Sequence, residues 1–219
     1  MLNGAFCEAK KSKAAKNAPI LLDWQGRDAG IEIPNWLKFV AENDKQKIVK
    51  EFGLEDYMVW IFDVRGDNLE FLESWTDKVE LQSNVAQSIS MEVGRATQAA
   101  LHAEENMSDA KISKAIEDVA TVLSSVRVKG LERFASCWIK TGIGKQGAKN
   151  NRDVSYVYYA VWGVPKNSYK KQLDAAMKNL PESTAQDSLL MNVIDASIEK
   201  AILDDADASL EGTTYNDVK

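Results

Sequence analysis

The feature that most constrains this chain is the order of the periodic segments in its middle part. A strand-like run at 57–64 precedes two amphipathic segments with helical spacing, at 72–100 and 112–126. Two more strand-like runs, 133–140 and 154–164, are joined by a glycine-rich loop and followed by another helical segment. This β-α-α-β-β-α order predicts an α+β fold with a small antiparallel or mixed sheet, backed by long amphipathic helices.

The longest apolar stripe of the chain predicts a helix from Asp67 to Glu105. Asp67 is a good N-cap residue, and Glu70 three residues later completes the pattern of a capping box. The stripe advances in steps of three and four, so we expect this helix to pack across one face of the sheet. Its residues are Leu72, Trp75, Val79, Ala86, Ile89, Val93, Ala96 and Ala100.

The run at 154–164 is apolar on both of its sides, which is typical of a central, covered strand. Asn167 or Ser168 can cap the helix that follows. We expect the segment 24–53 to extend or cover an edge of the sheet.

The chain divides by composition into four parts. Residues 1–20 predict a flexible basic arm or a signal remnant, because they carry lysines and few large apolar groups. Residues 21–180 predict the α+β domain, residues 181–205 a C-terminal helix that docks on it, and residues 206–219 an acidic tail. The net charge is −6, with 27 basic and 33 acidic residues, which argues against unspecific binding of nucleic acid.

The loop between the last two strand-like runs holds the pattern G-x-G-x-x-G at 142–147. A dinucleotide site requires a helix directly after such a loop, and the next strand begins too soon for one. The same loop is basic. We therefore predict an anion-contacting hairpin tip whose binding surface comprises Lys140, Lys145, Lys149 and Arg152.

The sequence contains few of the residue patterns that are typical of catalytic sites. His102 is the only histidine, and with Glu104 and Glu105 it forms a poor metal site, since a metal centre needs several convergent ligands. We predict no catalytic residue, no metal and no cofactor, although lysine or carboxylate bases remain open. Cys137 lies in an apolar strand, where a free cysteine usually behaves as a small buried hydrophobe. Tryptophan and tyrosine side chains could line a ligand cleft, but at these periodic positions they are more often core.

Two blocks of sequence are familiar. They are Asp23-Trp-Gln-Gly-Arg27, continued by Ile33-Pro-x-Trp-Leu37, and Tyr158-Tyr-Ala-Val-Trp-Gly-Val-Pro-Lys166. With the order of elements between them, the chain resembles the Lpp-twenty family of bacterial lipoproteins, in particular the versions found in spirochaete cell envelopes, over residues 22–180. The resemblance implies a sheet backed by helices, export to the envelope and no assigned enzymatic activity.

The resemblance also implies a lipidated N-terminal cysteine, for which Cys7 is the candidate; secretion with cleavage nearby is the alternative. The export signal before it is incomplete, without a charged or a long apolar region. We expect a non-enzymatic protein of the periplasm or outer membrane that contacts an envelope protein, an envelope polymer or anionic lipid, and no nucleic acid. The alternatives are a small-molecule binder or undetected enzyme with a cleft between helix and sheet, and a self-assembling subunit that forms homo-oligomers.

Overall fold

The computed structural model describes residues 19–76, 91, 93–95, 97–99, 108–144 and 151–203. The strands in these ranges are β1 (Ile20–Trp24), β2 (Tyr57–Gly66), β3 (Glu132–Ile143) and β4 (Arg152–Pro165). The helices are η2 (Arg27–Ala29), α1 (Trp36–Ala41), α2 (Lys45–Phe52), α3 (Leu69–Thr76), α5 (Asp109–Ser124), α6 (Lys166–Met177), α7 (Glu182–Ala185) and α8 (Ser188–Leu203).

The strands form one antiparallel sheet, which confirms the predicted α+β class. Among the described residues the sheet has four strands in the order β1-β3-β4-β2. β4 pairs with β2 on one side and β3 on the other, so it is the central strand that its two apolar sides predicted. β1 pairs with the far half of β3, from Ile139 to Gly142. The sheet edge is therefore extended by β1, at residues 20–24, while the predicted segment 24–53 contributes to that edge only its first residue.

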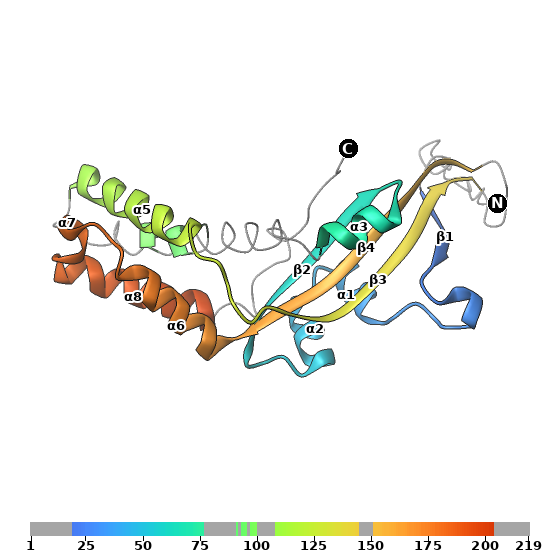
Figure 1. Ribbon diagram of the computed structural model, residues 1–219, viewed down its shortest axis with the longest axis horizontal. Coiled ribbons are helices and arrows are strands. Elements are labelled where there is room, and N and C mark those ends of the chain that lie inside the picture. The colour runs from blue at the N-terminus through green and yellow to red at the C-terminus, as the bar shows by residue number, and fades with distance from the viewer. Residues whose placement is uncertain are drawn as a thin grey trace, which may run out of the picture.

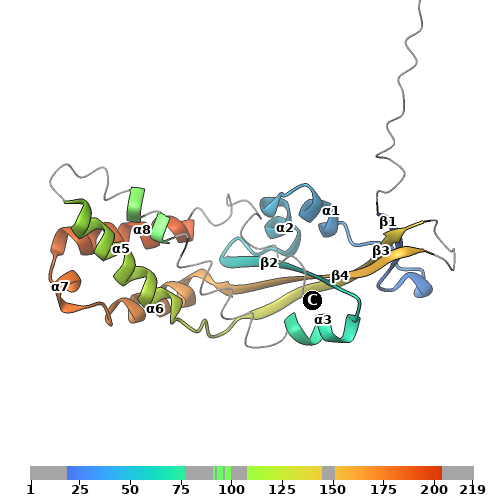
Figure 2. The same ribbon diagram turned by 90° about the horizontal axis from the view of Figure 1, so that it is seen from above.

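Helices cover the two faces of the sheet differently (Figure 2). On one side, here called the α1 face, Trp36 of α1 and Ile48 and Val49 of α2 pack on a cluster of buried strand residues. The strand residues of the α1 face are Val59, Ile61, Cys137, Tyr159 and Val161. On the other side, the α3 face, Leu72 of α3 is fully buried against a second set of strand residues. The strand residues of the α3 face are Val64, Trp138, Tyr156, Tyr158, Ala160 and Trp162.

At one end of the sheet, α5, α6, α7 and α8 form a helical lobe (Figure 1). Its core is continuous with the near end of the sheet, because Met58, Trp60 and Phe62 of β2 belong to the same buried cluster as the helices. Leu173 of α6 and Ile194 of α8 are fully buried there. The β3–β4 hairpin extends from this lobe, and its far half, from Trp138 on β3 and Tyr158 on β4 to the hairpin tip, is here called the arm.

The predicted helix from Asp67 to Glu105 lies only partly in the described ranges. α3 and residues 93–95 and 97–99 are helical, and Val93 is buried in the core. The predicted N-cap is wrong: the side chain of Asn68, not Asp67, accepts a hydrogen bond from the Phe71 amide at 3.0 Å.

The predicted caps of α6 are wrong as well. Asn167 and Ser168 lie inside the first turn, and Pro165 occupies the N-cap position. Proline fixes a φ near −65°, and here its φ of −55° leads directly from the strand into the helix. The predicted C-terminal segment 181–205 holds two helices, α7 and the longer α8, whose Leu190, Ile194 and Ile198 are buried.

Candidate functional site

The structure describes two of the four basic residues predicted as a binding surface. Lys140 of β3 pairs with Tyr156 of β4, and Arg152 of β4 pairs with Ile143. Lys145 and Lys149 lie outside the described residues, as does Cys7. Between Lys140 and Arg152 the register shifts: two steps along β3 match three along β4, and Asp153 has a φ of 49°.

This register separates the two described cations. Paired residues share a sheet face, and residues an odd number of positions apart on one strand point to opposite faces. Arg152 pairs with Ile143, which is three positions from Lys140. Lys140 therefore lies on the α3 face and Arg152 on the opposite one. A single partner could contact both residues only by wrapping around the hairpin.

On the α3 face, Lys140 belongs to a group of aromatic side chains. Its Nζ lies 5.0 Å from the centroid of the Tyr156 ring. Tyr156 is itself edge-on to Trp138, with ring centroids 5.7 Å apart and an interplanar angle of 76°. Both rings and Lys140 are half-buried, so the outer parts of these side chains meet solvent. A cation over an aromatic ring is attracted by the negative face of the ring and loses part of its conformational freedom.

The same arrangement recurs nearer the helical lobe. The guanidinium carbon of Arg133 lies 5.7 Å from the Trp162 ring centroid, and its Nη1 donates to the Tyr158 hydroxyl at 3.4 Å. The Trp162 ring is half-buried, while its Nε1 is buried without an acceptor. Five side chains, here called the aromatic face, thus follow one another along one side of β3 and β4. They are Arg133, Trp138, Lys140, Tyr156 and Trp162.

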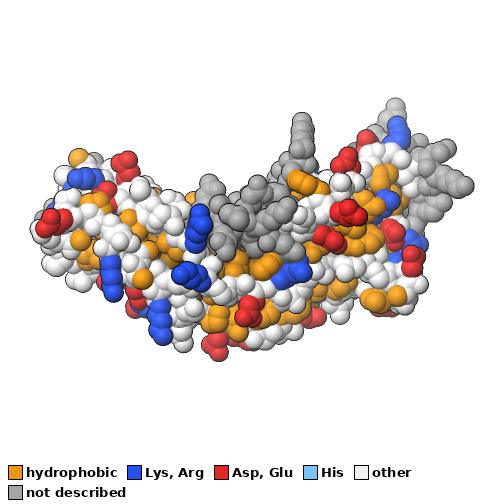
Figure 3. Space-filling model, viewed as in Figure 1, with side chains coloured by type: hydrophobic (Ala, Val, Ile, Leu, Met, Phe, Trp, Pro, Cys, Tyr) orange, Lys and Arg blue, Asp and Glu red, His pale blue; other side chains and the backbone are white. Residues whose placement is uncertain are grey.

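Figure 3 shows the α3 side of the molecule, where hydrophobic side chains reach the surface along the arm among charged ones. Of the two basic residues of the aromatic face, Lys140 lies on the arm, and Arg133 lies nearer the helical lobe. Its cross-strand register also places Asp23 of β1 beside it. Asp23 contacts Arg27 at 3.8 Å and accepts from the Trp24 amide at 2.9 Å, so its charge is already engaged.

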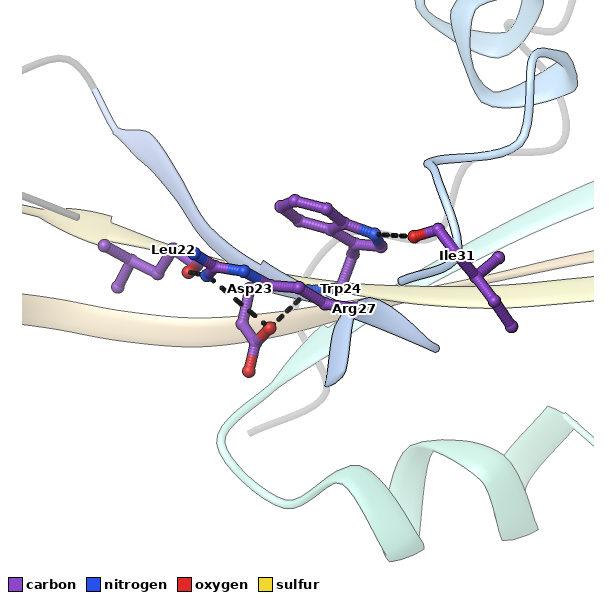
Figure 4. Close-up of polar contacts among 5 residues, drawn as sticks. All are labelled: Leu22, Asp23, Trp24, Arg27 and Ile31. Atoms are coloured by element: carbon purple, nitrogen blue, oxygen red, sulfur yellow. Dashed lines mark hydrogen bonds and ion pairs between the residues drawn. The ribbon is translucent and has the colours of Figure 1, made fainter. Parts of the chain in front are cut away.

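The first familiar block, Asp23–Arg27, fixes β1 to the arm (Figure 4). Arg27 donates to the Leu22 carbonyl at 2.6 Å and lies 4.9 Å from the Trp24 ring centroid, while Trp24 Nε1 donates to the Ile31 carbonyl at 2.8 Å. Gly26 is required at the turn: its φ is 84°, and a Cβ there would lie 2.9 Å from Ile31 Cδ1. The contacts close the loop after β1 upon the strand itself.

Gln25 in the same block holds the backbone of Trp138. Its amide donates to the Trp138 carbonyl at 3.0 Å, and its Oε1 accepts from the Trp138 amide at 3.3 Å. These two hydrogen bonds fix the backbone of Trp138, while its ring is in edge-on contact with Tyr156. This short block therefore helps to set the backbone position of one residue of the aromatic face.

The glycine pattern of the hairpin has a packing role at its first position. Gly142 lies in β3, and a Cβ there would meet Leu22 Cδ1 at 2.9 Å and Val154 Cγ2 at 3.2 Å. A side chain at position 142 would thus push β1 away from β3. Gly147 lies outside the described residues.

The α1 face carries a row of ionisable groups across three strands: Asp63, Tyr159 and Cys137. Burial raises the pKa of the Asp63 carboxyl, and the neighbouring Arg65 opposes this shift. Burial also raises the pKa of Tyr159, with a smaller contribution from the Asp63 charge. Cys137 is buried, as predicted, and burial raises the pKa of its thiol. A thiol that stays protonated is a weak nucleophile, so this row favours packing over chemistry.

Within the described ranges, no three His, Cys, Asp or Glu side chains converge as metal ligands. His102, Glu104 and Glu105 lie outside those ranges. The helices of the described part are too short or too polar to cross a bilayer. Comparison with protein-family profiles, curated proteins and solved structures found no match.

Sequence reasoning singled out Lys140 but missed Arg133, Trp138, Tyr156 and Trp162 as members of a site. The available signal was the alternation of β4, which places Tyr156, Tyr158 and Trp162 on one side. Their cationic neighbours on β3 follow only from the cross-strand register, which the sequence did not reveal.

Proposed function

We propose that this protein acts by binding an anionic component of the cell envelope, and that the aromatic face of the sheet is its contact surface. The observation that carries the proposal is the placement of Lys140 over Tyr156, beside the half-buried ring of Trp138. A cation held next to flat apolar rings can attract an anionic group and bury the apolar part of the same molecule. The envelope location rests on the resemblance of the two sequence blocks.

The anchoring of Trp138 supports this proposal. A surface ring that is fixed before binding loses little further entropy when a partner packs on it. The ring of Trp138 is held edge-on by Tyr156, and Gln25 holds the Trp138 backbone through one backbone and one side-chain hydrogen bond. The turn that presents Gln25 depends on Gly26 and Arg27. The familiar block and the aromatic face are therefore parts of one arrangement.

A binding experiment tests the proposal directly. Full-length protein is mixed with phosphatidylglycerol vesicles, polyphosphate or polygalacturonate, with phosphatidylcholine vesicles and dextran as neutral controls. We expect salt-sensitive retention by at least one anionic probe, because exposed charges are screened as ionic strength rises. Equal affinity for neutral and anionic probes, or no binding at all, would contradict the proposal.

The predicted basic tip is tested with the same probes. The triple variant Lys145→Ala, Lys149→Ala and Arg152→Ala should weaken retention without lowering the melting temperature. Arg152 is exposed, so its replacement removes charge but little packing. If retention survives both this triple variant and Lys140→Met, the hairpin is not the contact surface.

Self-assembly is a second candidate, and three exposed apolar residues favour it. Ile31, Phe71 and Val154 are 56%, 49% and 37% exposed. Association of copies through such residues predicts a solution mass above the 24.3 kDa of one chain. Sedimentation equilibrium at several concentrations measures that mass, and a constant value of one chain would refute this candidate.

A further inference from the structure

We propose that the ligand of the aromatic face is a linear acidic polysaccharide, with one sugar ring stacked on Trp138 and its acidic group paired with Lys140. This inference rests on the proposed function and deepens it by naming the chemical class of the ligand. It depends on three features of the arm: the partial burial of its aromatic rings, the order of ring and charge along β3, and the contacts that hold both.

The aromatic rings of this surface are partly buried. Trp138 and Tyr156 are half-buried side chains of a sheet, held edge to face against one another. Insertion into a lipid bilayer uses apolar side chains that protrude from the surface. A sugar ring instead lays its C–H groups flat on an aromatic ring and leaves its hydroxyl groups in water. The half-buried geometry therefore favours a polysaccharide over a lipid surface.

Ring and charge follow one another along a single strand face. Trp138 and Lys140 are two positions apart on β3, which corresponds to about 7 Å. A stacked acidic sugar carries its charge at the rim of its ring, so the charge falls beside the stacking position. Arg133, on the same strand face toward the helical lobe, places a second cation along the path of an extended chain.

Both groups are positioned in the free protein. The Lys140 ammonium lies over Tyr156, and the Trp138 backbone is bonded twice to Gln25. Free phosphate or polyphosphate could pair with Lys140 but would gain nothing from the Trp138 ring. The dependence of binding on that ring thus separates a polysaccharide from a simple polyanion.

The test is a titration of full-length protein with polygalacturonate oligomers, which carry one carboxylate on each sugar, followed by calorimetry. Trp138→Leu and Lys140→Met should each weaken binding about threefold to tenfold, the range expected for one aromatic or cation contact. Trp138→Tyr keeps an aromatic surface and should retain most of the affinity. Lys170→Met, on the helical lobe, is the matched charge control and should bind like the parent protein.

The folding of each variant is checked by its urea midpoint and near-ultraviolet circular dichroism. If Trp138→Leu fails to fold, the affinities of Trp138→Tyr, Lys140→Met and the parent protein are compared instead. In the parent protein, the amide chemical shifts of residues 138 and 156 are followed by NMR during the titration. Shifts at both amides with polygalacturonate support the inference, and their absence overturns it.

Two results would overturn this inference in distinguishable ways. If polyphosphate or phosphatidylglycerol vesicles bind as tightly as polygalacturonate, and Trp138→Leu binds them equally well, the ligand is a simple polyanion or a lipid surface; the proposed function then stands. If no anionic probe binds, the proposed function fails together with the inference.

Discussion

The near end of the sheet, where β2 pairs with β4, and the arm of β3 and β4 differ in how they are covered. Near the helical lobe, the residues of β2 from Met58 to Phe62 are buried on both faces. Along the arm, Tyr156 and Lys140 are only half-buried, and Val154 is 37% exposed. The comparison teaches that stability is concentrated at one end of the sheet, while the other end is left available for contact.

The largest expected effect lies in the helical lobe. Leu173→Ala removes a fully buried side chain and should cost about 2–5 kcal/mol of unfolding free energy, because it leaves a cavity in the core. Urea denaturation measures the change. The matched control is Leu189→Ala in the same lobe, where the side chain is 42% exposed and the expected loss is below about 1 kcal/mol. Equal losses for the two variants would break the contrast.

A smaller effect, of opposite sign, is expected on the α1 face. Because burial raises the pKa of Asp63, its charged form is disfavoured in the folded protein. The resulting penalty is absent below the unfolded pKa near 3.8 and complete once the pH exceeds the folded pKa. Asp63→Asn should therefore raise the urea midpoint at pH 7, and this gain should vanish toward pH 3.

Asp67→Asn, at an exposed position just after β2, is the control for this change and should leave the midpoint unaltered. A lower midpoint for Asp63→Asn at pH 7 would mean that the Arg65 attraction outweighs burial. The α1 face would then be stabilised by charge as well as by packing.

The next effect belongs to the start of α8. Lys111 is the main cause that lowers the pKa of Asp187, and the Leu190 amide, which donates to Asp187 at 3.1 Å, adds to it. A lowered pKa stabilises the fold above the unfolded value of 3.8, and this contribution is lost as the pH falls through the folded pKa. Asp187→Ala should thus lower the urea midpoint at pH 7 and have little effect near pH 2.

Asp187→Asn separates the two contributions, because asparagine can still cap the helix but carries no charge. We expect a midpoint between those of the parent protein and Asp187→Ala. A midpoint equal to that of Asp187→Ala would show that the ion pair with Lys111 acts alone.

The smallest effect on stability is expected on the arm. Lys140→Met keeps the apolar stem over Tyr156 and removes the charge, so unfolding free energy should change by less than about 1 kcal/mol. Thermal unfolding gives this value. A loss as large as that of Leu173→Ala would mean that the arm is part of the stabilising core, and the division between the two ends would be wrong.

Much of the fold followed from periodicity, and less of the site did. The apolar positions of β2, β4, α5 and α8 indicated those elements because burial of a continuous face leaves a strong pattern. β1 gave no such pattern: its five residues precede a glycine turn, and it is a strand because the arm pairs with it. The N-caps at Asn68 and Pro165 were missed because neighbouring residues of the chain are at least equally good capping types, and only the backbone geometry selects between them.

The site required information that one strand does not contain. Lys140 was identified from the charge of the hairpin, but its neighbours on the aromatic face come from β3 and β4 in a particular register. A bulge at Asp153 then moves Arg152 to the other face, which no count of charges could reveal. Lipidation of Cys7, the envelope location and the alternative of a small-molecule cleft stay predictions.

The central claim is that the near end of the sheet, with the helical lobe, stabilises the fold, while the arm binds the ligand. Hydrogen exchange of the full-length protein, with and without polygalacturonate, tests this claim most directly. Without the polymer, the amides of α6, α8 and the near half of β2 should exchange most slowly, because they open only with the whole core. The polymer should add protection to the β3–β4 arm, around Trp138 and Tyr156, and leave the helical lobe unchanged. Added protection in the helical lobe, with none along the arm, would contradict the account.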